Sequence, residues 1–349
     1  MPVIEHLELH HFRNYSRGIF DFTAPATVLT GRNGTGKSNL LEAVFFLSIL
    51  RSFRTAGIRE MIQLGERGFL LNATLRKVHY PVTLEIEQSA SARQLRIDTV
   101  PIRRSSGFIR EFRAVAFAPE DKLIVSGASS CRRKFFDMFI SVMEPGYLTA
   151  LQRYAASLAR RNAALRNPSA ESLAIAAAFE PELAETAAVI RPARRHWCSK
   201  ICKKVNDLLE KERLQCLYDP EDPDDPQEYQ AKLAAQRQRD RKRGFTTFGP
   251  QTDEFHFLLD GKSLRNFGSN GQLRLMSLYL KMAEFSLVRE EGSSPVIALV
   301  DDVTGELDQP SRENFFRLLQ QADQCLFTFT ELPQEPFFQH AQHLALDRM

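Results

Sequence analysis

The motif GRNGTGKS at positions 31–38 constrains the fold more than any other stretch of this 349-residue sequence. It fits G-x-x-x-x-G-K-[ST], in which the backbone N–H groups of a glycine-rich loop surround phosphate oxygens. The apolar run at positions 26–31 precedes it as a buried strand, and a helix is expected over residues 36–50. A strand, loop and helix in this order predict an α/β fold with a phosphate-binding loop (P-loop).

The loop residues predict a binding site for ATP and Mg²⁺. Lys37 is expected to reach the β- and γ-phosphates, and the Ser38 hydroxyl to bind Mg²⁺. The positive dipole end of the following helix adds to the attraction for phosphate. The alternative is a glycine-rich turn without a ligand. The expected phosphate-binding residues are Gly31, Arg32, Asn33, Gly34, Thr35, Gly36, Lys37 and Ser38.

A second motif supplies the carboxylates that a P-loop enzyme needs. The apolar strand PVIALVDD at positions 295–302 ends in Asp301 and Asp302. Ligands of open α/β sheets bind at the carboxyl ends of the strands, so Asp301 is the expected Mg²⁺ partner, through water. Asp302 is placed to orient or deprotonate the attacking water, which makes Lys37, Asp301 and Asp302 the expected catalytic residues. The alternative is that the acidic pair caps a turn.

The stretch FGSNGQLR, 267–274, narrows the class of P-loop enzyme. Ser269, Gly271 and Gln272 stand where a helix is expected to begin, about 30 residues before Asp301. The order of P-loop, helical insert, signature and acidic strand resembles that of ABC-type ATPases, in which the signature of one copy meets the γ-phosphate bound by a second copy. The alternative is an N-cap formed by Ser269 or Asn270.

Two further stretches resemble ABC-type elements. TGELD, 304–308, follows the acidic strand like the D-loop that crosses such a dimer interface, and this adds Asp308 to the expected ATP-binding residues. The strand LFTFT ends where ABC ATPases carry a switch residue, usually His. Thr328 or Thr330 would serve there.

The pattern of residues divides the chain into a head and an insert. Residues 1–128 and 244–349 read as strands and helices of an ABC-type P-loop ATPase head, and residues 129–243 as a mainly helical lobe. Pro192 is expected to kink a long helix or to start a new one. The run DPEDPDDP, 219–226, is expected to break the helical pattern before a charged helix over 227–243.

Charge follows the same division. Residues 129–243 hold 21 Lys and Arg against 16 Asp and Glu, whereas the rest of the chain holds 25 against 27. A basic lobe favours a partner with a phosphate backbone, although each cluster alone fits a solvated helix face. The clusters are Arg132-Arg133-Lys134, Arg160-Arg161, Arg194-Arg195, Lys203-Lys204 and Arg241-Lys242-Arg243.

Nothing in the sequence predicts export or a membrane span. No signal-peptide pattern precedes the first strand, and the longest apolar run is too short to cross a bilayer. Five scattered cysteines suit reduced thiols in a cytoplasmic protein. A zinc site formed by His196, Cys198, Cys202 and Cys216 is the alternative to plain helix packing, but these residues lack a C-x2-C unit.

The chain as a whole resembles the RecF family of bacterial recombination mediators, whose ATPase is related to SMC heads. The resemblance rests on LELHHFRNY (7–15), GRNGTGKSNLLEA (31–43), LRSFRT (50–55), FAPEDKLIVSGASSCRRKFFD (117–137), YAASLARRNAALRN (154–167), GSNGQLR (268–274) and LVDDVTGELD (299–308). It implies a weak, DNA-stimulated ATPase that dimerises on ATP and binds gapped DNA at junctions of single and double strands. It also implies work with RecO and RecR to load recombinase, in replication restart and the SOS response.

Two positions depart from the family pattern. GPQTDE at positions 249–254 replaces the usual Gly-Pro-His-Arg-Asp-Asp, which calls into question a phosphate or DNA contact at Gln251 and Thr252. Asn270 stands where the signature usually has Gln.

Three other functions compete with this interpretation. A stand-alone ABC-type ATPase of a defence system would share the head without the repair role, and such proteins often carry a nuclease or Toprim domain, for which the 40 or so residues after Asp308 are too few. A structural SMC-like protein would need long heptad arms. A small-molecule kinase would need neither the Ser-x-Gly-Gln element nor a basic lobe.

Overall fold

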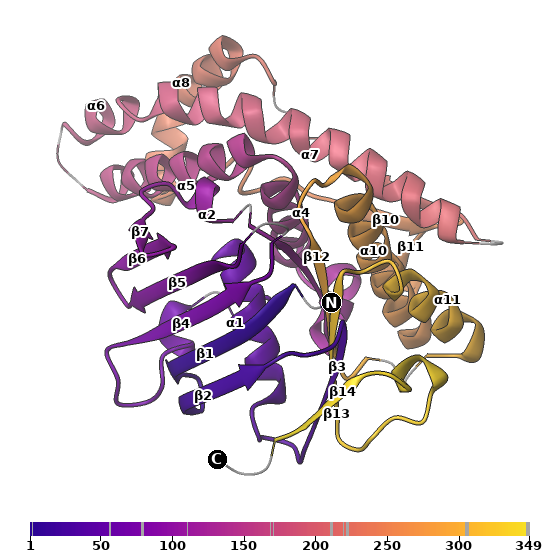
Figure 1. Cartoon of the computed structure of the whole chain (residues 1–349). Helices are drawn as coiled ribbons and strands as arrows, with labels where there is room; N and C mark the ends of the chain where they lie inside the picture. Colours follow the sequence, from indigo (N-terminus) through magenta and orange to yellow (C-terminus); the bar gives the residue numbers. More distant parts are fainter. Residues whose placement is uncertain are drawn as a thin grey trace. The chain divides into compact units, whose positions relative to one another are not determined.

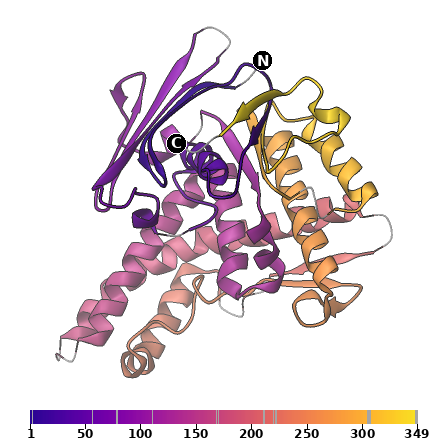
Figure 2. The ribbon, with the colours of Figure 1, turned by 90° about the horizontal axis from the view of Figure 1, so that it is seen from below.

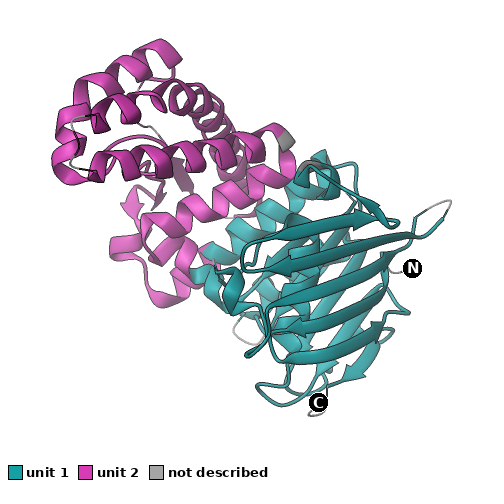
Figure 3. Cartoon of the chain, turned by 90° about the vertical axis from the view of Figure 1, so that its left-hand side faces the viewer, with its two compact units in different colours: residues 1–122, 277–349 teal, residues 123–276 magenta. Residues whose placement is uncertain are grey.

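Two compact units make up the chain (Figure 3). The computed structural model describes residues 1–349 except 2, 56, 78–79, 110, 168, 170, 210–211, 219, 221–222, 304–306 and 347–349. Unit 1 comprises residues 1–122 and 277–349, and unit 2 comprises residues 123–276. From its sequence, the head is expected to resume at residue 244. Residues 244–276 instead group with unit 2, because two strands of this segment share a sheet with a strand of the helical lobe.

A parallel sheet of unit 1 carries the P-loop. Its strand order is β14-β3-β13-β12-β8, and every neighbouring pair is parallel. β13 lies between the strand before the P-loop and the strand of the acidic pair. The carboxyl ends of all five strands meet at one edge, where α/β proteins bind ligands. The strands are β3 (Ala26–Thr30), β8 (Arg113–Phe117), β12 (Val296–Asp301), β13 (Gln324–Phe329) and β14 (Gln342–Ala345).

An antiparallel sheet forms the other layer of unit 1 (Figure 1). Buried and half-buried positions alternate along β4, as expected for a sheet with one face on the core. Its order is β2-β1-β4-β5-β6-β7, formed by β1 (Ile4–Phe12), β2 (Tyr15–Asp21), β4 (Gly68–Leu75), β5 (Val82–Ser89), β6 (Arg93–Ile97) and β7 (Val100–Pro101).

Helix α1 (Lys37–Ile49) forms the centre of unit 1. Residues 40–49 are all buried, so the helix is apolar on every side and needs cover all round. It contacts β8, β12 and β13 of the parallel sheet and β1 of the antiparallel sheet, and Figure 2 views it nearly end-on. The other elements are η1 (Ile58–Glu60), α2 (Ser105–Phe108), η2 (Pro119–Lys122), α11 (Gln309–Leu319), η4 (Pro336–Phe338) and α10 (Asn270–Glu291), which begins in unit 2.

Unit 2 is mainly helical and includes a small antiparallel sheet of order β11-β10-β9. Helix α7 (Glu180–Leu208) packs against α4, α5, α8 and β9. The remaining elements are α3 (Leu123–Ser126), α4 (Ser129–Met143), α5 (Pro145–Arg166), α6 (Ser172–Ala177), β9 (Leu214–Leu217), α8 (Pro226–Arg243), β10 (His256–Leu259), β11 (Lys262–Ser263) and α9 (Leu264–Phe267).

The expected elements are present with ends shifted by a few residues, and two details differ. Helix α7 continues through Pro192, so no new helix starts there. Strand β9 lies inside the stretch that was expected to be helical. It is only four residues long, and its partner β10 follows about 40 residues later, so no local pattern indicates it.

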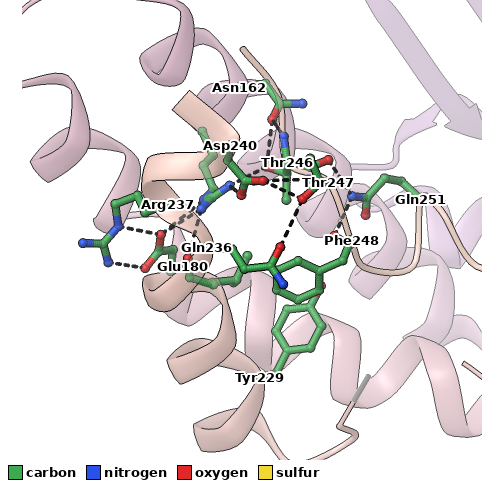
Figure 4. Close-up of polar contacts among 12 residues, drawn as sticks. Asn162, Glu180, Tyr229, Gln236, Arg237, Asp240, Thr246, Thr247, Phe248 and Gln251 are labelled. Carbon is green, nitrogen blue, oxygen red and sulfur yellow. Dashed lines mark hydrogen bonds and ion pairs between the residues drawn. The ribbon is translucent and has the colours of Figure 1, made fainter. Parts of the chain in front are cut away.

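Buried arginines join the helices of unit 2. The Arg161 side chain is fully buried, and it donates to Asp240 Oδ2 at 2.8 Å, to Glu180 Oε1 at 3.1 Å and to Thr246 Oγ1 at 2.7 Å. Figure 4 shows part of this network, in which Arg237 also binds Glu180. Three helices, α5, α7 and α8, thus meet at one set of charges. A buried charge of this kind is tolerated because every partner is also satisfied.

A second buried network centres on Asp253. Arg191 donates to Asp253 Oδ1 at 2.9 Å, and Arg194 donates to Asp253 Oδ2 at 3.3 Å. Arg194 also pairs with Asp137 of α4 at 2.9 Å. Members of the basic clusters noted in the sequence therefore serve the fold of unit 2 itself.

Gln251 is also committed to the fold of unit 2. Its Nε2 donates to the Phe248 carbonyl at 2.7 Å (Figure 4), and its Oε1 accepts from the Tyr154 hydroxyl. Thr252 donates to the Gly249 carbonyl at 2.8 Å. Both side chains hold the turn that places Asp253.

Neither a membrane span nor a metal cluster occurs in the described part of the chain. None of the helices described is both long enough and apolar enough to cross a membrane. Within the described ranges, His, Cys, Asp and Glu side chains form no group of three or more that could hold a metal ion, so the zinc alternative gains no support.

Replacing Arg161 with Ala is expected to destabilise unit 2 by about 3–5 kcal/mol, because Asp240 would remain buried with its charge uncompensated. Urea unfolding followed by the fluorescence of Trp197, the only tryptophan, reports on α7 directly. Arg160→Ala is the matched control, because Arg160 is exposed and its loss should change stability by less than about 0.5 kcal/mol. Equal losses in the two variants would contradict the role of Arg161.

Candidate functional site

The P-loop backbone adopts conformations that only glycine takes easily. Gly34 has φ 85°, and Gly36, the N-cap of α1, has φ 105°. A Cβ on Gly36 would lie 2.7 Å from the Tyr15 hydroxyl oxygen, so the position also lacks space for a side chain. These conformations turn the loop between β3 and α1 around a concave backbone surface.

Lys37 is folded over this loop. Its Nζ donates to the carbonyls of Gly31 at 2.5 Å and Arg32 at 3.0 Å. Desolvation lowers the pKa of Lys37, while the charges of Asp302 and Asp301 act to raise it. The ammonium therefore lies in the P-loop, close to the acidic pair.

Asp301 is the meeting point of three segments. As the last residue of β12, it is 7% exposed, and its Oδ1 accepts from the Ser38 hydroxyl at 2.7 Å. The same oxygen accepts from the Thr328 hydroxyl at 2.7 Å. Asp301 and Thr328 are paired residues of parallel strands, which places their side chains at the same level. The structure thus brings together Ser38 and Asp301, the two residues expected to bind the metal.

Asp302 differs from its neighbour Asp301 in backbone conformation and in exposure. Its φ is 53°, a left-handed conformation that costs a non-glycine residue about 1–3 kcal/mol and is often found at functional sites. The side chain is exposed, and its charge acts on Lys37. The position suits a carboxylate that faces solvent at the edge of the parallel sheet.

Of the two threonines considered for the switch position, Thr328 is 1% exposed and bound to Asp301. Thr330 is exposed, one residue beyond the end of β13. The two therefore have different surroundings: Thr328 orients the carboxylate, while Thr330 lies at the open edge.

A support behind the P-loop was not found by sequence reasoning. The Tyr15 hydroxyl donates to the Gly36 carbonyl at 3.0 Å. Glu42 of α1, 0% exposed, accepts from Arg13 Nε and Nη2 at 2.7 Å each and from the Ser52 hydroxyl. Arg54 Nη1 lies 3.8 Å from Glu42 Oε2. The turn between β1 and β2 and the segment after α1 thereby fix the orientation of the P-loop helix.

The signal for this support was present in the blocks LELHHFRNY and LRSFRT, which carry the resemblance to RecF. Residue chemistry alone gave Arg13, Tyr15 and Arg54 no role. Glu42 lies 29 positions from Arg13 and 12 from Arg54, and Gly36 lies 21 positions from Tyr15, so no local pattern indicates these contacts.

The signature residues form a reciprocal cap in unit 2. Gln272 N–H donates to Ser269 Oγ at 3.2 Å, and Ser269 N–H donates to Gln272 Oε1 at 3.0 Å. These two bonds form the capping box of a helix N-terminus. Of the two candidates for the N-cap, Ser269 therefore holds this position, and Asn270 is the first residue of α10. All four residues from Ser269 to Gln272 are exposed.

Nothing in the described part of the chain requires glycine at position 271. Its φ lies outside the left-handed region, and the nearest atom to an added Cβ would be Ser269 Oγ at 4.0 Å. Alanine would fit here and favour the helix by about 1 kcal/mol. The missing side chain leaves the helix N-terminus open to a ligand or another molecule.

Asp308 caps helix α11. Its carboxylate accepts from the Ser311 N–H at 2.9 Å, and hydrogen bonds from the side chain and the backbone of Ser311 lower the pKa of Asp308. Thr304, Gly305 and Glu306 of the expected D-loop lie outside the described residues.

Comparisons with known proteins agree on one family. The family model described as RecF/RecN/SMC N terminal domain matches residues 3–345. The DNA replication and repair protein RecF of Cyanothece sp. is 34% identical over 351 residues, covering 94% of this chain and 92% of that protein. RecF of Pediococcus pentosaceus is 30% identical over 342 residues, covering 93% and 91%.

A solved structure shares the fold over nearly the whole chain. The structure of the recombination mediator protein RecF with ATP, from the RecFOR pathway, superposes with a TM-score of 0.85 and 26% identity. The match covers 95% of this chain and 93% of that one. The expected fold, an ABC-type ATPase head with a helical lobe, is confirmed by this match.

Substituting Ala for Gly36 is expected to destabilise unit 1 by at least about 1–3 kcal/mol, from backbone strain and the contact with Tyr15. Gly271→Ala is the control, because its Cβ meets open space and should leave stability unchanged or slightly raised. Thermal unfolding followed by circular dichroism compares the two. A Gly36→Ala protein as stable as the Gly271→Ala protein would contradict the claim that position 36 requires glycine.

Proposed function

We propose that this chain, which belongs to the RecF family of DNA replication and repair proteins, is an ATP-gated DNA clamp of recombinational repair. In this proposal, ATP joins two copies, the joined copies hold DNA, and slow, DNA-stimulated hydrolysis releases it. The proposal rests on the hydrogen bond from the Ser38 hydroxyl to the Asp301 carboxylate. This bond lies beside a P-loop in which Gly34 and Gly36 have positive φ angles.

The residues at the edge of the parallel sheet fit ATP and Mg²⁺. Residues 31–37 would hold the phosphates through backbone N–H groups and the Lys37 ammonium, which would exchange its two carbonyl partners for phosphate oxygens. A hydroxyl and a carboxylate, from Ser38 and Asp301, are hard oxygen ligands that suit Mg²⁺. When bound, MgATP supplies the phosphoanhydride whose hydrolysis resets the clamp.

Thr328, Asp302 and Lys37 have separate roles in the proposed hydrolysis. Thr328 holds the Asp301 carboxylate from β13, the strand that lies between β12 and the P-loop strand β3, so that the carboxylate keeps one orientation. Asp302 is exposed and has a positive φ, and its carboxylate orients or deprotonates the attacking water. Lys37 neutralises the charge that develops on the transferred phosphoryl group.

A second copy would complete each ATP site through the signature. Ser269 and Gly271 lie exposed at the N-terminus of α10, where unpaired N–H groups attract anions. The fold of unit 2 does not require glycine at position 271, so an approaching phosphate explains its small size. Gln272, bound to Ser269, keeps the serine in place, and Asp308 lies near the chain segment proposed to cross the interface.

The DNA-binding surface follows from sorting the basic residues of unit 2 by burial. Arg132, Arg161 and Arg194 are at most 3% exposed and serve ion pairs within the unit. α5 and α8 end side by side, since a Cβ on Gly244 would lie 3.2 Å from Arg166 Cγ. The exposed cations at these two helix ends, here called the basic end, are Arg166, Arg239, Lys242 and Arg243.

The basic end fits a phosphate backbone better than a single small anion. Its charges come from two helices, and the carboxylate of Asp240 within the same turn of α8 is 0% exposed and paired with Arg161. Several exposed cations on one surface bind DNA by releasing counterions, without reading sequence. We assign this surface to the backbone of gapped DNA.

The partners of the proposed clamp follow from the family. The similar solved RecF is described as a recombination mediator of the RecFOR pathway. By this likeness the present chain would act with RecO and RecR to load recombinase at junctions of single- and double-stranded DNA. Replication restart and the SOS response would depend on that step.

Ser269→Arg is expected to retain ATP binding by the single copy and to lose ATP-dependent dimerisation, because the added side chain would occupy the place of the second copy's phosphate. Lys37→Ala is the counterpart and should lose ATP binding, and dimerisation with it. Equilibrium ATP binding and size-exclusion chromatography with ATP separate the two defects. Normal ATP-dependent dimers from either variant would refute the proposed clamp.

The double variant Lys242→Ala/Arg243→Ala is expected to lower the salt dependence of DNA binding. Each lost phosphate contact should reduce the slope of log K against log salt by about 0.9. Fluorescence anisotropy with gapped DNA at several salt concentrations measures this slope. Arg103→Ala/Arg104→Ala removes the same charge from exposed positions of unit 1 and should leave the slope unchanged. An equal change in both double variants would argue against the basic end.

A further inference from the structure

Three of the five cysteines meet in unit 2. Cys198 and Cys202 lie one turn apart on α7, and Cys216 lies on β9. The Cys216 N–H donates to Cys202 Sγ at 3.2 Å, and the Cys216 thiol hydrogen bonds with the thiols of Cys198 and Cys202. The tertiary fold, not the sequence spacing, creates this cluster.

A cavity of about 450 Å³ gives access to these thiols. Cys202 and Cys216 are half-buried, whereas Cys198 is only 2% exposed. Arg195 and Lys203 also line the cavity, and Arg195 is paired with Asp224 at 2.8 Å. A small polar reagent can therefore reach Cys202 in the folded protein.

The thiols of the cluster differ in acidity. Hydrogen bonds from Cys216 lower the pKa of Cys202 to about 7, so a large fraction is thiolate at neutral pH. Burial raises the pKa of the Cys216 thiol, so this thiol is protonated at neutral pH. The thiolate is the nucleophile in reactions with oxidants, so Cys202 is the reactive member.

We propose that Cys202 is a redox-sensitive thiol that a hydroperoxide oxidises and that Cys216 then captures as a disulfide. The Cys202 thiolate attacks one peroxide oxygen, the O–O bond breaks, and a sulfenic acid and hydroxide result. The Cys216 sulfur loses its proton and attacks the Cys202 sulfur, the S–O bond breaks, and water leaves. Two thiols thus supply two electrons to one hydroperoxide, and a thiol reductant reverses the change.

Cys216 is the partner because Cys202 Sγ already lies against its main chain. A sulfur 3.2 Å from the main-chain nitrogen of the other cysteine fits a pair close enough for a disulfide, which requires Cα atoms within about 7 Å. The bond would tie the end of α7 to β9. β9 pairs with β10, from which the chain continues through β11 and α9 to Ser269.

Peptide mapping of the full-length protein tests this proposal. The native protein is treated at pH 7 with hydrogen peroxide, alkylated, digested and analysed by mass spectrometry. The expected product is a peptide pair linked by Cys202 and Cys216, lost after reduction with dithiothreitol. Cys202 should also react with iodoacetamide at least about threefold faster than Cys131, the half-buried thiol of α4.

Two variants identify the roles. Cys216→Ser should leave Cys202 as a sulfenic acid that a dimedone-type probe captures, and Cys202→Ser should abolish both the probe label and the link. Cys131→Ser is the matched control and should keep the link. A Cys198–Cys202 link, or a Cys202 thiol no more reactive than Cys131 in the unmutated protein, would overturn the proposal.

Discussion

The hydrogen bonds to the Asp301 carboxylate are the interaction on which the functional site depends. One oxygen accepts both the Ser38 and Thr328 hydroxyls at 2.7 Å, and this joins the P-loop helix and two parallel strands at one point. The order β3-β13-β12 places Thr328 between the other two segments. Behind them, Tyr15 and buried Glu42 hold the P-loop helix. The rigid sheet edge thereby sets where phosphate and metal would lie.

Sequence reasoning located this edge but not its support. The P-loop and the strand before Asp301 are local patterns whose chemistry is fixed by residue type and order. The bond between Arg13 and Glu42 joins segments 29 positions apart, and no local pattern indicates it. The same holds for β9, a short strand that takes its partner from a distant segment.

Charge in unit 2 illustrates a second limit of sequence reasoning. A count of basic residues treats every arginine as available to a partner, yet Arg161 and Arg194 are buried in ion pairs that join helices. Burial cannot be read from a count, because it depends on which helix faces pack together. The exposed cations at the ends of α5 and α8 form a smaller surface with a clearer proposed role. The residues expected to form the signature make a capping box, and they are exposed at the N-terminus of α10.

The central claim, that each ATP site is shared between two copies, is tested most directly by mixing two inactive variants. Lys37→Ala retains its signature, and Ser269→Arg retains its P-loop. The account predicts that neither variant alone hydrolyses ATP or dimerises with ATP, whereas an equimolar mixture forms heterodimers with one complete site and recovers up to about half of the ATPase activity. A mixture as inactive as its components, with no ATP-dependent heterodimer, would contradict the account.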